Sequence, residues 1–403
     1  MNPWPTRRSL LTGALGASVL PLVASAASAV PLARHLVVVL SYGGWDTAYA
    51  VDPKPDRVGG AAGRLATFDG VDVWVDDARP SVEDFFARTR GATRLVRGVD
   101  VASVSHGVCL RAVLTGSHER EVPDIGTRVA AGVGADVPLP CLNMGSVGQP
   151  GPLASLVGRT GQSNQLAALL DPIAGLVTPH GALEPWEAAE VAELVSRRAQ
   201  VVRGPAHVPE RVADFVDTGW RAEAMKLRAA ALGPVDRELS WEARADQAAS
   251  ALRRGLSRVV LLDAGLDFDT HRSNGPQGAL HEELFARLGT VLDALEGRHD
   301  PGANDLLGDT VVLVVSEMSR SPVLNPSGGK DHWPVATYLL CGGPVRGGRV
   351  VGSTDPDGRA LPIDLVTGSA GSTVLTPAAV LGAVMALFGL DNPYDTEALH
   401  ALL

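Results

Sequence analysis

The sequence has few cysteines and few aromatic residues, which limits the kinds of metal site, disulfide and core that the chain can form. Only three cysteines, Cys109, Cys141 and Cys341, occur in 403 residues. They form no Cys-x-x-Cys pair, which excludes a zinc site of that thiolate pattern, and their odd number allows at most one disulfide within the chain. Cys141 and Cys341 stand in apolar contexts and are predicted to be core residues. Aromatics make up only 4% of the chain, against 45 Gly and 28 Pro, which indicates an aliphatic core with many loops.

Positive charge is also scarce. The formal net charge is −10, and no Lys/Arg-rich run occurs beyond the N-terminus. A nucleic-acid partner is therefore not expected. Hydrophobic residues at 45% and charged residues at 20% are typical of a globular protein, and the length suits one large α/β domain or two smaller ones.

The chain lacks a long hydrophobic run at its N-terminus. Residues 10–24 are apolar but short for a membrane span, so a membrane anchor is the less favoured alternative. They follow Arg7-Arg8, and small residues around Ala26 offer a cleavage site. This pattern predicts a Tat export signal over residues 1–29, with the Tat translocon as a partner during export. The mature protein would be periplasmic, bound to the cell wall or secreted.

Short apolar runs that suit strands covered on both faces recur through the rest of the chain. They lie at residues 35–41, 93–99, 139–144, 258–263, 310–316, 337–341 and 349–351. Helical patterns at 125–133, 278–295 and 376–388 alternate with them. This alternation predicts an α/β fold, with a mostly parallel central sheet and helices on both faces, in a single domain over residues 30–403.

One block differs from this alternation. Residues 183–256 are rich in Ala, Arg and Glu and carry apolar residues at helical spacing. We expect a helical insertion that packs over the sheet or beside the site through Trp186, Phe215 and Trp220.

Acidic and histidine residues follow three of the predicted strands, where sites of open parallel sheets gather. Asp46 comes after Gly43-Gly44 at the end of the first strand, and either binds a cation or caps the next helix. Asp269 and His271 stand two residues apart after the 258–263 strand, so an extended loop points both side chains the same way. The alternative to a role in the site is that His271 is an exposed loop histidine.

A second group follows the strand at 310–316. A buried Glu317 needs a cation or a donor, and Arg320 as a structural ion-pair partner is the alternative to a metal. Asp331 and His332 are adjacent on a Gly-rich loop; His332 would bind a metal while Asp331 orients it or contacts substrate. The sequence therefore predicts a metal centre.

Ser105-His106 is a further candidate for the catalytic group. A serine at the start of a helix that faces a metal can be an activated nucleophile. The alternative is that Ser105 only caps the helix.

Together these fragments resemble domain-of-unknown-function family 1501, a Tat-exported family of the alkaline phosphatase and sulfatase superfamily. The matching segments are the twin arginine, Gly43–Asp46, Ser105–His106, Asp269–His271, Ser316–Arg320, Gly329–Trp333 and Gly347–Asp355. The resemblance implies an alkaline-phosphatase-like fold with one or two divalent metals. It places the residues as follows: Asp46 as the first-strand ligand, Ser105 near the nucleophile position, Asp269 with His271 as a middle pair, Glu317 in place of the Asp of an Asp-His pair, and His332 as a late ligand.

The chain departs from that pattern at two points. Met318 follows Glu317 where a histidine belongs, so one metal site loses a ligand. The Cys-x-Pro-Ser-Arg run of formylglycine sulfatases is missing from the sequence.

The resulting expectation is an exported metal-dependent hydrolase of phosphate or sulfate esters. Zn, Ca, Mg or Mn would bind to Asp46, Asp269, His271, Glu317, Asp331 and His332. Ser105 and His106 would act in catalysis, while Arg320 or Lys330 steadies the ester. The substrate would be a small anionic ester or a cell-envelope polymer. The alternative, which Met318 favours, is a catalytically degenerate member that binds an extracellular polymer or a protein.

Overall fold

The computed structural model describes residues 32–57, 63–145, 147–160 and 239–403, with a few single positions between 190 and 225. The predicted export signal lies outside the described residues, as do Trp186, Phe215 and Trp220 of the predicted insertion. Residues 241–253, near the end of the predicted insertion, form α7 (Trp241–Arg253). Its N-cap is Ser240, whose side chain accepts a hydrogen bond from the Ala243 N–H.

The core of the described chain is an eight-stranded sheet in the order β12-β4-β11-β8-β1-β7-β5-β6. Its strands are β1 (His35–Tyr42), β4 (Thr93–Asp100), β5 (Cys141–Met144), β6 (Val157–Arg159), β7 (Val259–Asp267), β8 (Thr310–Val315), β11 (Val335–Cys341) and β12 (Arg349–Val351). Every neighbouring pair is parallel except that β11 runs antiparallel to β4 and β8. The prediction of a mostly parallel sheet is confirmed.

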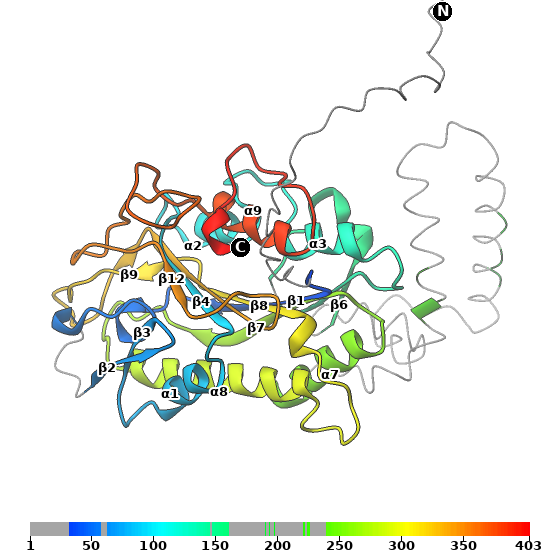
Figure 1. The fold of residues 1–403 in the computed structure, drawn as a ribbon, viewed down its shortest axis with the longest axis horizontal. Coiled ribbons are helices and arrows are strands. Elements are labelled where there is room, and N and C mark those ends of the chain that lie inside the picture. Colours follow the sequence, from blue (N-terminus) through cyan, green and yellow to red (C-terminus); the bar gives the residue numbers. More distant parts are fainter. Residues whose placement is uncertain are drawn as a thin grey trace, which may run out of the picture. The chain divides into compact units, whose positions relative to one another are not determined.

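The helices form two layers, one on each face of the sheet (Figure 1). They are α1 (Pro80–Arg88), α2 (His106–Thr115), α3 (Ile125–Val133), α7, α8 (Pro276–Glu296) and α9 (Pro377–Leu387). Alternate residues of β1 enter opposite cores: Val37 and Val39 join the cluster that includes α1, α7 and α8, while Leu36 and Val38 join that of α2, α3 and α9. Both faces of the strand are covered, which explains its unbroken apolar run.

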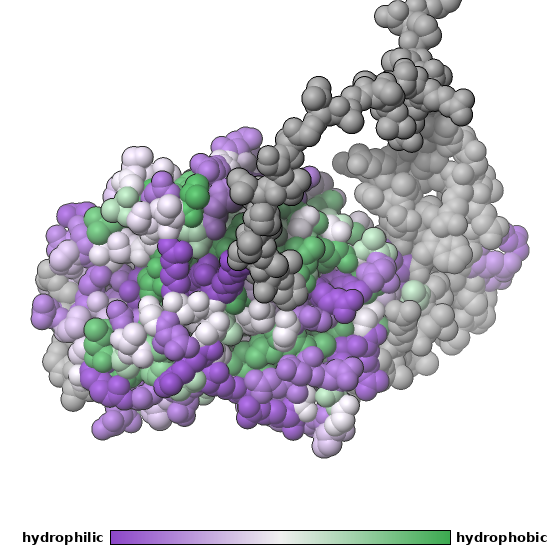
Figure 2. Space-filling view, viewed as in Figure 1, coloured by the Kyte–Doolittle hydropathy of each residue, from purple (hydrophilic) through white to green (hydrophobic). Residues whose placement is uncertain are grey.

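The outer helices keep polar residues toward solvent. On the face drawn in Figure 2, hydrophilic residues gather along the outer side of the layer that contains α1, α8 and α7. Among the helices of the described part of the chain, none is long and apolar enough to span a bilayer. Cys109, Cys141 and Cys341 are all buried and free, as expected for core residues.

Two small ladders were not predicted. β2 (Arg64–Phe68) and β3 (Val71–Val75) form a hairpin whose two turn residues, Asp69 and Gly70, both have positive φ, as a tight Asp-Gly turn requires. β9 (Ser319–Arg320) pairs with β10 (His332–Trp333). This second ladder joins the segment that follows Glu317 to the Gly-rich loop that carries Asp331 and His332.

Candidate metal centre

The sheet topology brings the predicted site segments to one edge. β1, β4, β7 and β8 all run in the same direction, so their carboxyl ends lie together. Because β11 runs the opposite way, its amino end lies at that same edge, and β10 directly precedes it. Five loops that are far apart in the sequence therefore meet there.

Three histidines converge on one carboxylate at this edge. The Nε2 atoms of His106, His271 and His332 lie 3.5, 3.1 and 3.3 Å from the carboxylate oxygens of Asp269. The His271 and His332 Nε2 atoms are only 2.9 Å apart. Ligating atoms of His106, Asp269 and His332 all lie within 4.8 Å of one another, so these three residues could hold one metal ion.

The other nitrogen of each ring faces an oxygen. His106 Nδ1 is 2.7 Å from Glu317 Oε1, His332 Nδ1 is 2.7 Å from the Val104 carbonyl oxygen, and His271 Nδ1 is 3.3 Å from Asp331 Oδ1. A carbonyl or an ionised carboxylate only accepts hydrogen bonds, so each Nδ1 carries the proton and donates it. A ring that carries only this one proton presents a lone pair at Nε2, which is the arrangement of histidine metal ligands held by outer partners.

The close approach of the imidazole nitrogens favours a positive charge between them. Two Nε2 lone pairs 2.9 Å apart repel unless a proton or a cation lies between them. The hydrogen bond from His106 to Glu317 raises the pKa of that imidazole above its ordinary value. Burial would raise the pKa of Asp269, but the hydrogen bond and charge of Arg320 hold it below its usual value. An anionic Asp269 among three imidazoles is a donor set that suits a divalent cation.

Glu317 is fully buried and acts through His106. Its carboxylate accepts hydrogen bonds from the Gly43 N–H at 2.9 Å and from the Ser316 hydroxyl at 3.1 Å. Gly43 has a φ of +99°, and a Cβ there would lie 2.4 Å from the backbone nitrogen of Phe268. Glycine at this position therefore permits the close approach of the backbone to neighbouring segments and its hydrogen bond to the Glu317 carboxylate.

Asp46 lies outside this histidine group. Its buried carboxylate is 2.6 Å from the ammonium of Lys330 and accepts a hydrogen bond from Asn274 at 3.0 Å. It also accepts one from the Ala48 N–H and so caps the short 3-10 helix Thr47–Tyr49. Asp46 thus occupies the helix-capping position that was the alternative to a metal ligand. Lys330 is buried in the ion pair with Asp46 and is not open to substrate.

Arg320 is likewise committed to the protein. Its buried guanidinium donates to the carbonyls of Gly43, Gly44 and Lys330, and to Asp269 Oδ1 at 2.7 Å. These contacts tie the ends of β1, β7 and β9 together. The ion-pair alternative holds for Arg320, but the partner is Asp269 and not Glu317.

Ser105 is at the N-cap of α2, where its hydroxyl makes no capping hydrogen bond and the residue is exposed. Its neighbours on both sides touch the centre: the Val104 carbonyl accepts from His332, and His106 reaches Asp269. Asp331 is largely exposed, and the hydrogen bonds from Asn325 and His271 lower its pKa.

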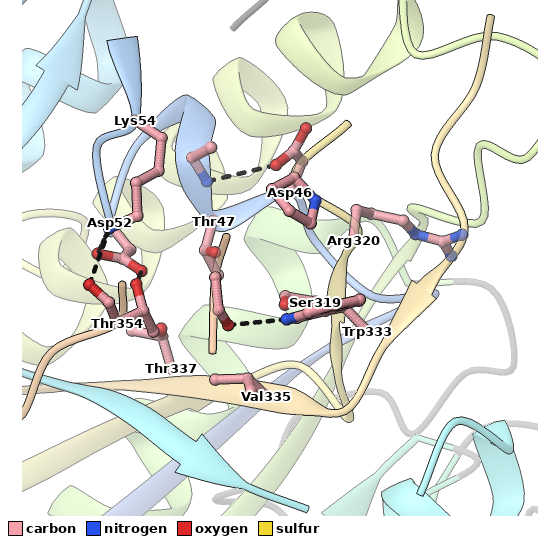
Figure 3. Close-up of a pocket in the computed structure, with 13 residues that line it drawn as sticks. Asp46, Thr47, Asp52, Lys54, Ser319, Arg320, Trp333, Val335, Thr337 and Thr354 are labelled. Carbon is pink, nitrogen blue, oxygen red and sulfur yellow. Dashed lines mark hydrogen bonds and ion pairs between the residues drawn. The ribbon is translucent and has the colours of Figure 1, made fainter. Parts of the chain in front are cut away.

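A small cavity lies beside the centre (Figure 3). Asp46, Arg320 and Trp333 contribute to its lining, together with Asp52 and Lys54. Its volume is about 20 Å³, which is room for roughly one water molecule. This cavity is therefore too small for an organic substrate.

Sequence reasoning missed three contributors. Tyr42 stacks on His106 with ring centroids 5.1 Å apart, the Val104 carbonyl fixes the His332 tautomer, and Asn325 donates to both Asp331 and the His271 carbonyl. Tyr42 directly precedes Gly43 at the end of β1, which is the one local signal available. A backbone carbonyl has no signature in a sequence.

Comparison with known proteins gives a limited match. A family described as a protein of unknown function (DUF1501) matches residues 221–367, less than half of the chain. The matched part contains Asp269, His271, Glu317 and His332 but neither Asp46 nor Ser105. No curated protein matches the chain.

Three solved structures that partly match the chain are a lipoteichoic acid synthase, a phosphonate monoester hydrolase and an alkaline phosphatase. The lipoteichoic acid synthase LtaP from Listeria monocytogenes is 9% identical, with 92% of this chain and 75% of that one covered and a TM-score of 0.39. Phosphonate monoester hydrolase SpPMH from Silicibacter pomeroyi is 13% identical, with 91% and 76% covered and a TM-score of 0.41. The alkaline phosphatase of the Antarctic bacterium TAB5 is 10% identical, with 77% and 91% covered and a TM-score of 0.34.

Proposed function

We propose that this protein is an exported hydrolase of phosphate or sulfate esters that works with one divalent metal ion. The observation that carries the proposal is the shared geometry of three imidazoles. Each Nδ1 is held by an oxygen acceptor, and each Nε2 points at the Asp269 carboxylate. Export through the Tat route remains part of the proposal on the strength of the N-terminal pattern.

The donor set fits a metal ion of borderline softness. Three imidazole nitrogens and one carboxylate oxygen suit zinc better than calcium or magnesium, which prefer oxygen ligands. His106, His271, His332 and Asp269 would hold the ion, and Glu317 and Asp331 would orient two of the rings. A bound ion would polarise an ester oxygen and neutralise its charge.

We expect one ion because the neighbouring acid is already neutralised. Asp46 is paired with Lys330, and both side chains are almost completely buried. A second divalent ion at Asp46 would have to displace that ammonium. The buried ion pair therefore limits the centre to the histidine side.

The start of α2 would bind the ester oxygens, and Ser105 would be the nucleophile. The start of α2 leaves the N–H groups of His106 and Gly107 without an acceptor in the helix, so they are available to ester oxygens. A Cβ on Gly107 would meet no atom within 4 Å, so this end of the helix is open. The Ser105 oxygen would attack phosphorus or sulfur as the bond to the alcohol breaks; the alcohol leaves with the serine proton, and water then hydrolyses the seryl ester.

A binding protein without turnover is the second candidate. It is favoured by the burial of Arg320 and Lys330 in ion pairs with Asp269 and Asp46, because these were the two cations predicted to bind the ester. Such a protein would bind metal and an anionic extracellular ligand but would not cleave it.

Metal-loaded mature protein tested against aryl phosphates and sulfates separates the two candidates. The hydrolase proposal expects turnover that EDTA abolishes and that Ser105→Ala reduces by at least about a hundredfold. Tight metal binding with no turnover of either ester class would favour the binding protein. Turnover that survives EDTA would contradict a metal-dependent reaction.

A further inference from the structure

The edge of the sheet that carries the histidines also carries exposed apolar side chains. Among the described residues, Tyr42, Val104, Val323 and Leu324 are large hydrophobics with 36%, 51%, 53% and 53% of their surface exposed. Single exposed hydrophobics are ordinary on a protein surface. These four come from three separate segments that meet at one site.

Each of the four lies in a segment that contacts the histidine group or a residue bonded to it. Tyr42 stacks on His106, and the Val104 carbonyl accepts a hydrogen bond from His332. The Val323 carbonyl accepts from the Ser321 hydroxyl, which in turn accepts from the Asp331 N–H. Leu324 directly precedes Asn325, which donates to Asp331. We call these four side chains the apolar rim.

The charges at the same edge oppose a polyanionic substrate. Among the described residues of the loops at this edge, Asp267 and Asp331 are exposed acids, and Arg272, which follows His271, is an exposed cation. Arg320 and Lys330 are buried in ion pairs with Asp269 and Asp46. A chain with many sulfate or phosphate groups would bring further negative charge to an acidic surface.

We infer that the substrate of this centre is an amphiphilic monoester, with a single anionic head at the histidines and an alkyl or aryl group against the apolar rim. This inference rests on the proposed function and names its substrate class. The metal and the start of α2 complement the anionic head, while the rim complements the remainder of the molecule.

The test measures binding, so it does not depend on turnover. Mature protein loaded with one equivalent of zinc is titrated calorimetrically with methyl-, butyl- and octylphosphonate, and with a disulfated disaccharide. Each methylene that becomes fully buried tightens binding roughly fourfold. Because the rim is open, we expect octylphosphonate to bind at least about tenfold tighter than methylphosphonate and tighter than the disaccharide.

A matched pair of variants locates the effect. Leu324→Ser should weaken octylphosphonate about fivefold and methylphosphonate much less. Leu65→Ser, which alters an equally exposed leucine on the β2–β3 hairpin, should change neither affinity. Equal effects of the two variants would overturn the assignment of the rim.

The outcomes also separate the two proposals. Affinity that is independent of chain length, or tightest for the disaccharide, overturns the apolar rim and leaves the metal centre intact. If zinc-loaded protein binds none of these anions, the proposed function is overturned, and the assignment of the apolar rim is overturned as well.

Discussion

At the scale of single residues, the centre depends on which nitrogen of each imidazole is free. Glu317, the Val104 carbonyl and Asp331 each occupy one Nδ1, so three different kinds of chain position produce the same tautomer. This orientation fixes the direction of the lone pairs before any ion binds. Substitutions of Glu317 and Asp331, which orient the rings, therefore test the proposed centre as directly as substitutions of its ligands.

His332→Ala should remove one nitrogen ligand and weaken zinc binding by about tenfold or more. His118→Ala is a matched control, because His118 also bonds a backbone carbonyl of the same segment, Val101, at 2.8 Å. Melting curves with and without EDTA measure both variants. If both variants keep the metal-dependent shift of the wild type, His332 is not a ligand.

Glu317→Gln should change the pH dependence of zinc binding. The pKa of His106 is raised by Glu317, so the stabilising imidazolium–carboxylate contact of the metal-free protein is present below about pH 6.5 and is lost as pH rises through the raised pKa. Zinc competes with that proton, so its affinity increases over the same range. The variant should bind zinc about ten- to a hundredfold more weakly and shift the midpoint to lower pH.

Zinc titrations by calorimetry from pH 5.5 to 8.5 supply the midpoints for this comparison. Glu83→Gln, which alters an exposed pair with Arg64, is the control and should leave the midpoint in place. A midpoint that stays constant or rises in Glu317→Gln would exclude the proposed coupling.

The sequence marked the residues that meet at this edge but not their partners. Asp269, His271 and His332 were predicted as metal ligands, whereas His106 was predicted as a catalytic residue beside Ser105; the structure brings all four side chains together. Asp46 also follows a buried strand, yet its carboxylate faces Lys330, a residue of a distant loop. Nothing near Asp46 in the chain distinguishes an acid that meets an ammonium from one that meets imidazoles.

At the scale of elements, the turn between β1 and the following 3-10 helix controls the centre. Gly43→Ala should destabilise the fold by about 2 kcal/mol or more, because φ is +99° and the new Cβ would collide with backbone atoms of Phe268 and Asp269. Gly107→Ala, at the start of α2, meets no atom within 4 Å and should stabilise the fold by roughly 0.5 kcal/mol. Urea unfolding curves measure both; equal effects would show that Gly43 is not conformationally required.

Element prediction succeeded where burial is uniform. The continuous apolar runs of β1 and β8 identified buried strands, and the patterns of α3 and β12 gave their observed bounds. The β9–β10 ladder was missed because two-residue strands have no periodicity to detect. That ladder brings His332 to the end of β7. The sequence therefore predicts the separate segments of the site, and the fold shows that they meet.

At the scale of the whole molecule, metal binding and folding should be linked. An ion that binds only the folded chain stabilises it by RT ln(1 + [L]/Kd), or about 2.7 kcal/mol at a hundredfold excess over Kd. EDTA should therefore lower the melting temperature, and added zinc should restore it. A melting temperature that neither EDTA nor zinc changes would show that folding is not linked to metal binding.

The most direct test of the account is the metal content and coordination of the purified mature protein. Elemental analysis after exhaustive dialysis of zinc-loaded protein should give one ion per chain, and X-ray absorption should show three imidazole nitrogens and one carboxylate oxygen around it. His332→Ala should lose one imidazole from that shell. A protein that retains no ion, or one bound without histidine nitrogens, would contradict the proposed centre.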